Sequence, residues 1–119
     1  MSKTLVVGAS TNPGRYSNIA IRRLVEHHIE TTAFGIRGGT VSEVQIKHNL
    51  EEFQNIDTVT LYLNPKNQEP YYEQILDLKP RRVIFNPGTE NPEFYKKLEA
   101  QGIKVEAACT LVLLATGQY

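Results

Sequence analysis

The residues of this chain that are best suited to chemistry lie together near its start, in the range 8–17. Gly8 ends the apolar run 4–7, and the stretch after it carries Arg15 and three hydroxyl side chains, all donors that suit phosphate oxygens. A buried strand that turns at a glycine and continues into a helix points unpaired N–H groups and the positive end of the helix dipole at the loop. The stretch therefore predicts a phosphate-binding loop, and the alternative interpretation is a strand, turn and helix that hold no ligand.

Two familiar phosphate-binding patterns do not fit this loop. The dinucleotide pattern G-x-G-x-x-G requires a glycine where this chain has Ser10. The nucleotide-triphosphate pattern G-x-x-x-x-G-K-[ST] fails because Gly8 and Gly14 are one residue too far apart and Arg15 replaces the lysine. Ordinary NAD binding and nucleotide triphosphate hydrolysis are both disfavoured.

A second cation narrows the ligand class. The predicted second strand ends in the sequence 35–37, Gly-Ile-Arg, without the carboxylate that would bind ribose hydroxyls. Arg37 instead lies where a ribose phosphate could sit, a combination that suits NADP or coenzyme A (CoA). Taken alone, Arg37 is equally consistent with a solvated surface side chain.

These residues need a scaffold, and the rest of the chain alternates predicted strands with predicted helices. The pattern predicts strands at 4–7, 30–36, 57–63, 82–85 and 103–107, helices at 18–28, 67–78, 92–101 and 110–115, a short connector or edge strand at 44–47, and a helical turn at 50–53. Asn91 and Pro92 suit the N-cap and first position of the third helix. The alternation predicts an α/β fold: a Rossmann-like, doubly wound, mainly parallel five-stranded sheet with helices on both faces, in a single domain over 1–119.

Ligands of such sheets bind at the carboxyl ends of the strands. The predicted strand-end loops, each with small or polar residues, are 8–17, 35–39, 63–67, 86–89 and 107–110. We expect these loops to lie side by side and to form the binding crevice.

Composition excludes several other classes of function. The 119 residues include 13 basic and 13 acidic side chains, so no net charge attracts nucleic acid or an anionic membrane. Cys109 is the single cysteine, the start lacks the apolar run of a signal peptide, and no run approaches the roughly 18 apolar residues that cross a bilayer. We expect a cytoplasmic protein with a small-molecule ligand and no metal site, while a homodimer or protein partner through tyrosines and phenylalanines at 71–72 and 94–95 stays open.

The opening motif resembles a known family. Gly8-Ala9-Ser10-x-x-Pro13-x-Arg15-Tyr16-Ser17 is similar to the opening G-A-S-x-x-P-x-[KR]-[YF]-S of the small stand-alone CoA-binding domain proteins, relatives of the N-terminal CoA-binding domain of the succinyl-CoA synthetase α subunit. Weaker similarities at Asn64-Pro65, Asn86-Pro87-Gly88 and Cys109 extend over most of the chain. The stretch 35–39 departs from the family, which has an Asn-Pro after its second strand and a glycine-containing connector before the next one.

The resemblance implies a Rossmann-like fold and a CoA whose diphosphate lies over the first loop. It places the following residues at the phosphates: Gly8, Ala9, Ser10, Pro13, Arg15, Tyr16 and Ser17. Gly35, Ile36 and Arg37 neighbour the adenosine end, and the predicted binding site is completed by Asn64, Pro65, Asn86, Pro87, Gly88 and Cys109.

Catalytic candidates are few. Cys109 lies at the predicted start of a helix, where the thiol pKa could be lowered, but it also fits a small buried residue at the sheet end. His27 and His28 end a predicted helix and His48 lies in the irregular connector, so no histidine is expected in a strand-end loop. We therefore predict non-catalytic binding of CoA or a CoA derivative. The alternatives are an NADP-type nucleotide-binding domain and a Cys109-dependent enzyme or redox-regulated protein, for instance one that forms a mixed disulfide with CoA.

Overall fold

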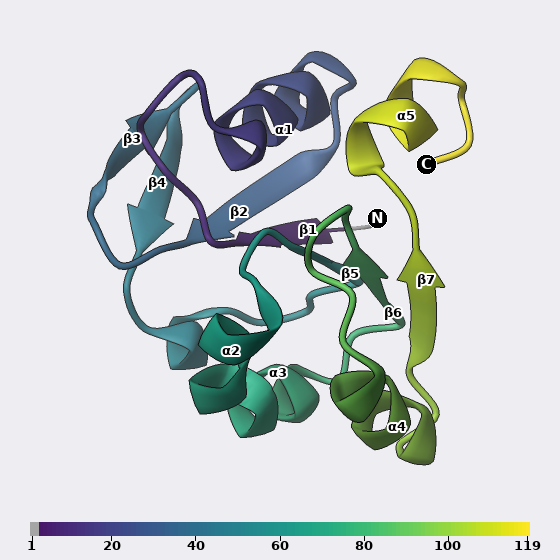
Figure 1. Cartoon of the computed structure of the whole chain (residues 1–119). Coiled ribbons are helices and arrows are strands. Elements are labelled where there is room, and N and C mark those ends of the chain that lie inside the picture. Colours follow the sequence, from purple (N-terminus) through teal and green to yellow (C-terminus); the bar gives the residue numbers. More distant parts are fainter. Residues whose placement is uncertain (1–2) are drawn as a thin grey trace.

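The computed structural model describes residues 3–119, which form a seven-stranded sheet with helices on both faces (Figure 1). In chain order the elements are β1 Lys3–Val7, α1 Tyr16–Glu26, β2 Glu30–Phe34, β3 Gly39–Val41, β4 Val44–Lys47, the 3-10 turn η1 Leu50–Glu52, β5 Thr58–Leu61, α2 Pro65–Gln68, the 3-10 turn η2 Glu69–Tyr71, α3 Tyr72–Leu78, β6 Arg82–Phe85, α4 Pro92–Ala100, β7 Lys104–Ala107 and α5 Thr110–Ala115. The predicted α/β fold with a mainly parallel sheet and helices on both faces is confirmed.

The strand order across the sheet is β3-β4-β2-β1-β5-β6-β7, with β1 in the middle. All neighbours pair in parallel except β3 and β4, which are antiparallel. The prediction of five strands was wrong, because a hairpin of β3 and β4 extends the sheet beyond β2. Its turn is made by Ser42 and Glu43, both with positive φ (48° and 69°), rather than by the Asn-Gly or Asp-Gly pair that signals such turns in a sequence.

The sheet separates two hydrophobic cores, as residues alternate between the faces of each strand. On one face, Leu5 and Val7 of β1 belong to the core beneath α3 and α4. Phe85 of β6 and Phe94 of α4 belong to the same core. On the opposite face Val6 contributes to the core beneath α1 and α5. Figure 1 shows α1 and α5 on one side of the sheet and α2, α3 and α4 on the other. Burial on both faces explains the apolar runs at the ends of β1 and β6.

The predicted helix at 67–78 is broken into three pieces. Asn64 caps α2 by accepting a hydrogen bond from the Asn67 N–H at 2.9 Å, so the helix begins at Pro65, before its expected start. Pro70 lacks an N–H donor and lies within η2, which separates α2 from α3. The prediction for α4 is confirmed at its start, where the Asn91 side chain accepts from the Phe94 N–H at 3.2 Å.

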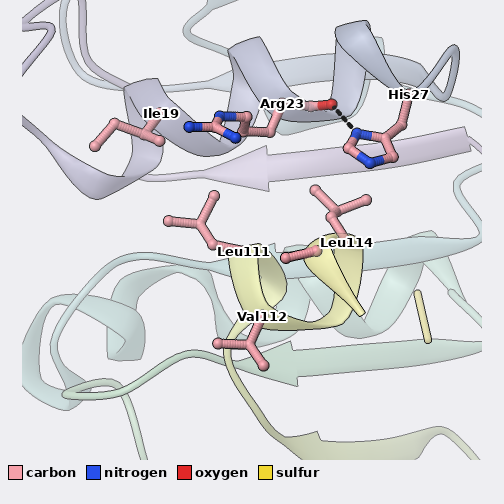
Figure 2. Close-up of a pocket in the computed structure, with 7 residues that line it drawn as sticks. Ile19, Arg23, His27, Leu111, Val112 and Leu114 are labelled. Atoms are coloured by element: carbon pink, nitrogen blue, oxygen red, sulfur yellow. Dashed lines mark hydrogen bonds between the residues drawn. The ribbon is translucent and has the colours of Figure 1, made fainter. Parts of the chain in front are cut away.

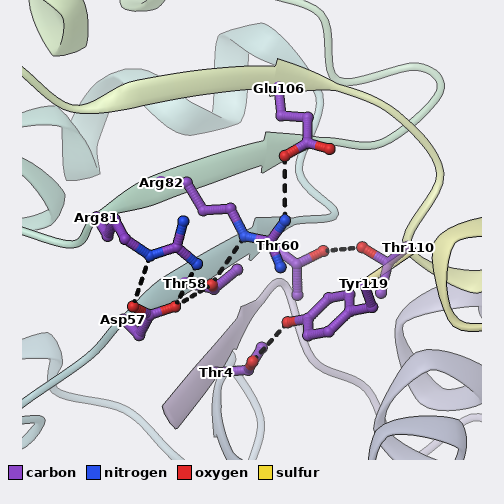
Figure 3. Close-up of polar contacts among 9 residues, drawn as sticks. All are labelled: Thr4, Asp57, Thr58, Thr60, Arg81, Arg82, Glu106, Thr110 and Tyr119. Atoms are coloured by element: carbon purple, nitrogen blue, oxygen red, sulfur yellow. Dashed lines mark hydrogen bonds and ion pairs between the residues drawn. The ribbon is translucent and has the colours of Figure 1, made fainter. Parts of the chain in front are cut away.

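The edge of the sheet at which the central strands begin carries a buried polar cluster (Figure 3). Arg82 on β6 is only 7% exposed, donates to the Thr58 hydroxyl at 3.0 Å and pairs with Glu106 of β7 at 3.1 Å. The Tyr119 ring lies 4.6 Å from the Arg82 guanidinium, and its hydroxyl hydrogen-bonds to Thr4 of β1. This cluster holds the segment after α5 against the sheet.

Candidate functional site

Six parallel strands end at the same edge of the sheet, which we call the strand-end edge. It consists of the segments that follow β1, β2, β4, β5, β6 and β7, namely 8–15, 35–38, 48–49, 62–64, 86–91 and 108–109. The chain moves from β1 to β2 on one side and later to β5 on the other, so the strand order reverses between β1 and β5. That point is where open α/β sheets bind ligands, and the first loop begins there.

The first loop is held by hydrogen bonds to the end of β2. Gly8 has φ of +95°, a conformation that other residues rarely adopt, and a Cβ there would lie 3.1 Å from the carbonyl group of Tyr62. The N–H groups of Gly8 and Ala9 both donate to the Phe34 carbonyl at 2.9 Å. The loop is thus fixed between β2 and the segment after β5 at its first turn.

The remainder of the loop is ordered by its own side chains. The Ser10 Oγ accepts from the Asn12 N–H at 3.0 Å, and the Asn12 Oδ1 accepts from the Gly14 N–H at 2.9 Å. Asn18 in α1 donates to the Ser10 carbonyl at 2.9 Å, and Arg22 donates to the Pro13 carbonyl at 3.1 Å. A loop ordered by these bonds loses little conformational freedom when an anion binds.

Helix α1 starts without a partner for its positive end. Arg15 occupies the N-cap, no side chain caps the helix, and its first turn holds no acidic residue. Arg15 and Tyr16 are exposed, Tyr16 by 71%, whereas Ser17 is 4% exposed. The helix start therefore favours an anion beside Arg15.

The segment after β2 lies directly against the first loop. A Cβ on Gly35 would come within 2.5 Å of the Ala9 carbonyl oxygen, so only glycine allows the two segments to lie this close. Ile36 is 81% exposed, and Arg37 is exposed as well. The structure thus brings the predicted phosphate and adenosine residues together.

Two arginines at this edge have side chains without a partner in the part of the chain that the structure describes. Four of the six arginines in the sequence form side-chain hydrogen bonds or ion pairs, namely Arg22, Arg23, Arg81 and Arg82. Within residues 3–119, Arg15 and Arg37 form neither, and both lie on strand-end segments. Both guanidinium groups are thus available to an anionic ligand.

The predicted residues after β5 and β6 have structural roles. Asn64 caps α2, and Pro65 is its first residue. Asn86 is 2% exposed and donates to the Thr60 hydroxyl and the Leu61 carbonyl, while its Oδ1 accepts from the Thr110 N–H at 2.8 Å. These contacts occupy the Asn86 amide and leave it no free group for a ligand.

The loop after Asn86 offers a less favourable setting for phosphate. Pro87 and Gly88 are exposed, but the Gly88 N–H donates to the Glu90 carboxylate at 2.9 Å. Gln68, which the sequence analysis did not single out, is fully buried and donates to the carbonyls of Leu63 and Thr89, so it ties this loop to the segment after β5. Its role is structural, and no sequence pattern marked it.

Cys109 is the N-cap of α5 and carries a partly exposed free thiol. Within the described residues its sulfur has no hydrogen-bond partner, and no histidine bonds to it. Nearby, the Tyr62 hydroxyl is buried without a hydrogen-bond partner among the described residues. Burial raises the pKa of Tyr62 to about 12, although the Thr110 side chain lowers this pKa in part. Tyr62 therefore stays protonated at neutral pH.

The family model described as a CoA binding domain matches residues 2–115. The chain belongs to the CoA-binding domain family. A solved structure described only as that of an uncharacterized protein is 44% identical, covers 100% of this chain and 98% of its own, and has a TM-score of 0.96. A Thermus thermophilus protein is 21% identical, with coverage of 99% and 90% and a TM-score of 0.89, and a hypothetical protein from Pyrococcus horikoshii is 25% identical, with coverage of 98% and 83% and a TM-score of 0.87. A search of the curated proteins found no match.

One residue of this CoA-binding domain was misplaced by the sequence analysis. No histidine was expected at a strand end, yet His48 follows β4, which is parallel to β2 and ends at the same edge. Its Nδ1 lies 3.1 Å from the Gly35 carbonyl oxygen. The apolar alternation at 44–47 predicted this strand, but the sequence did not show that the strand pairs with β2.

Two hollows in the structure are lined by none of the residues that the sequence analysis assigned to the ligand. A groove of about 270 Å³ runs between α1 and α5 and is lined mainly by apolar side chains, among them Ile19, Leu111 and Leu114 (Figure 2). A second hollow of about 280 Å³ lies beside Asp57 and Arg82, where Figure 3 shows the charged groups bonded to one another. The hydrogen bond from Arg81 holds the pKa of Asp57 below its ordinary value, because it favours the charged carboxylate.

Two other expectations concern metals and membranes. Within residues 3–119, no group of three or more histidine, cysteine, aspartate or glutamate side chains is placed to hold a metal ion. No helix in the same residues combines the length and apolar character that crossing a bilayer requires.

Proposed function

We propose that this chain binds CoA or a CoA derivative through the loop from Gly8 to Ser17, without catalysing a reaction on it. The observation that carries the proposal is the pair Arg15 and Arg37, the two arginines without a side-chain partner among the described residues, of which Arg15 is the N-cap of α1 and Arg37 lies on the segment after β2. Membership of the CoA-binding domain family supports the same ligand class.

The first loop suits the diphosphate of such a ligand. The positive end of α1, the Arg15 guanidinium and the Ser10 hydroxyl, whose proton is still available to donate, would bind phosphate oxygens. The backbone at Gly8, Ala9 and Pro13 would line the site without donating to the phosphates, because the Gly8 and Ala9 N–H groups already donate to the Phe34 carbonyl and proline has no N–H. Because the loop is already fixed by hydrogen bonds, the binding free energy is not spent on ordering it.

Exposed apolar side chains also support a bound ligand at this edge. Within residues 3–119, Tyr16 and Ile36 are two of the three large hydrophobic residues that are exposed, and both lie on the segments that would hold the nucleotide. A ligand that covers them would remove apolar surface from water, which is favourable by about 25 cal/mol per Å². We assign Gly35, Ile36 and Arg37 to the adenosine end, and Pro65, Pro87 and Gly88 to the far side of the site.

The proposal of a non-catalytic role rests on Cys109. Its thiol lacks a hydrogen-bonded base among the described residues, and nucleophilic catalysis by a thiol depends on such a partner or on a lowered pKa. NADP is a second candidate ligand, because the end of β2 carries Arg37 in place of a carboxylate.

The decisive experiment is calorimetric titration with CoA, NADP and ATP. We expect CoA to bind, and at 100 times its Kd to raise the stability of the fold by about 2.7 kcal/mol in a thermal-shift assay. Arg15→Ala should weaken CoA binding about tenfold, the usual worth of one charge-assisted hydrogen bond. Arg23→Ala is the matched control, since Arg23 lies on the same helix and pairs with Glu26.

The outcomes separate the alternatives. Binding of NADP but not of CoA would replace CoA by NADP as the ligand. No binding of any of the three would overturn the proposal. Cys109→Ser should keep its affinity for CoA, whereas a mass increase of the wild-type protein by one CoA, absent in Cys109→Ser, would show a mixed disulfide at Cys109.

A further inference from the structure

His48 occupies a place at the strand-end edge that the CoA site described above leaves unused. Lys47, the last residue of β4, accepts a backbone hydrogen bond from the Gly35 N–H at 3.1 Å, so His48 lies beside Gly35 in the next strand outward. Gly35 in turn lies against Ala9 of the first loop. Since adjacent strands lie about 4.8 Å apart, His48 is on the order of 10 Å from the start of the phosphate loop, with the segment 35–38 between them.

The ring of His48 is oriented by one nitrogen and leaves the other free. Its Nδ1 lies 3.1 Å from the Gly35 carbonyl oxygen, an acceptor, so Nδ1 carries the proton and donates. Nε2 lies over the segment after β2, where a Cβ on Gly38 would be 3.2 Å from it. The residue is exposed, and Nε2 has no hydrogen-bond partner within residues 3–119.

Both basic and acidic residues lie close to His48 along the chain and the sheet. Arg37 lies on the segment that the ring contacts and has no ion pair among the described residues. Lys47 precedes His48, and its ammonium group lies 3.9 Å from the Glu52 carboxylate. Glu52 is thus matched by Lys47, and Glu51 follows His48 by three positions; Arg37 and His48 form no ion pair within residues 3–119.

We propose that His48 and Arg37 form a second anion subsite, which selects adenine nucleotides that carry a phosphate on the ribose. This inference rests on the proposed function, because it takes the diphosphate to lie over the first loop. The ribose then lies over Gly35, and a phosphate on its 2′ or 3′ oxygen extends away from β1, toward Arg37 and His48. Arg37 supplies a fixed charge, and the free nitrogen of His48 donates to the phosphate when the ring is protonated on both nitrogens.

Pairs of ligands that differ by this phosphate alone test the inference. We expect CoA to bind the wild-type protein at least tenfold more tightly than dephospho-CoA, as one or two charge-assisted hydrogen bonds provide. His48→Ala and Arg37→Ala should each reduce that preference several-fold by weakening the binding of CoA, and His48→Ala should leave the affinity for dephospho-CoA unchanged within twofold. His27→Ala is the matched control, since His27 follows α1 and bonds to its backbone.

A conservative variant distinguishes contact with the ligand from support of the loop. The Asn side chain in His48→Asn can still donate to the Gly35 carbonyl but has no counterpart of Nε2. If His48 contacts the ribose phosphate, His48→Asn binds CoA as weakly as His48→Ala. Recovery of wild-type affinity in His48→Asn would overturn the inference and leave His48 as a positioning residue.

The remaining outcomes separate this inference from the proposed function. Equal binding of CoA and dephospho-CoA would overturn the second subsite while CoA binding itself stands. Comparing the affinities for NADP and NAD, which also differ by one ribose phosphate, shows whether the phosphate that binds belongs to CoA or to NADP. A preference for NADP over NAD that His48→Ala removes, with no binding of CoA, would support the subsite and overturn CoA as the ligand. If none of the four ligands binds, both the subsite and the proposed function fail.

Discussion

Replacement of Gly35 by alanine is the sharpest test of how the strand-end edge is built. A Cβ at this position would lie 2.5 Å from the Ala9 carbonyl oxygen and 3.1 Å from the Ile46 Cγ2. Real Cβ atoms essentially never come closer than 3.0 Å to another heavy atom, so the two segments must separate by about half an ångström. The Ala9 oxygen belongs to the backbone of a loop whose N–H groups are bonded to Phe34, so it has little freedom to move.

The loss of folding stability in Gly35→Ala follows from this rigidity. Insertion of one methyl group into a well-packed site destabilises a protein by about 1–3 kcal/mol, and a backbone contact leads to the upper part of that range. For a chain of this size, each kcal/mol lowers the Tm by roughly 4 °C. We therefore expect Gly35→Ala to lower the Tm by roughly 8–12 °C and, because the first loop moves, to weaken CoA binding as well.

The assays are thermal denaturation, which gives the Tm, and CoA titration of the folded variant. Gly14→Ala is the matched control, because its Cβ would meet only the Asn12 Oδ1 at 3.4 Å. We expect that variant to be neutral or stabilised by up to about 1 kcal/mol, through the loss of backbone freedom in the unfolded chain. Wild-type stability in Gly35→Ala would refute the close approach of the two segments.

Three further substitutions test the groups around the site. Asn86→Ala should destabilise the fold by about 2–3 kcal/mol in urea denaturation, because buried partners lose their bonds to this amide, and a variant as stable as wild type would contradict that role. Tyr62→Phe should keep or raise stability by up to about 1 kcal/mol, since the hydroxyl it removes is buried and unpartnered; a clear loss in the same assay would reveal a hidden bond. Asp57→Asn should lower stability at pH 7 by up to about 1 kcal/mol. The folded pKa of Asp57 lies below its ordinary value of 3.8, so this contribution is present above pH 3.8 and disappears as the pH falls through the folded value; a difference that persists at about pH 2 would exclude the ion pair with Arg81 as its source.

Local signals in the sequence were sufficient for the elements that begin and end at marked residues. Asn91 and Pro92 predicted the start of α4, and the bounds of β6 and α5 follow from apolar runs next to polar or proline residues. The opening strand, loop and helix were predicted in order, although α1 begins at Tyr16, ahead of the expected residue 18. The strand at 44–47 was predicted with the bounds of β4, but β3 and the hairpin were missed because the turn residues, Ser42 and Glu43, carry no turn signal.

The composition of the site required contacts between distant parts of the chain. From the sequence, Asn86 and Arg37 were equally good ligand residues. The structure shows that the Asn86 amide is bonded to Thr60, 26 positions earlier, while Arg37 has no partner among the described residues. Strand pairing decides which polar side chains are hydrogen-bonded within the protein, and no short stretch of sequence indicates how the strands pair.

The sequence by itself therefore determined the loop from Gly8 to Ser17, the alternating α/β pattern and the family, because glycine placement, apolar periodicity and helix caps act over a few residues. The tertiary structure decided that β4 pairs with β2, which brings His48 to the carbonyl of Gly35, 13 positions earlier. It also decided that Gly35 lies against Ala9 and that the side chains of Arg15 and Arg37 have no partner among the described residues. These features depend on the register of parallel strands, which is set when side chains from the whole chain pack on both faces of the sheet.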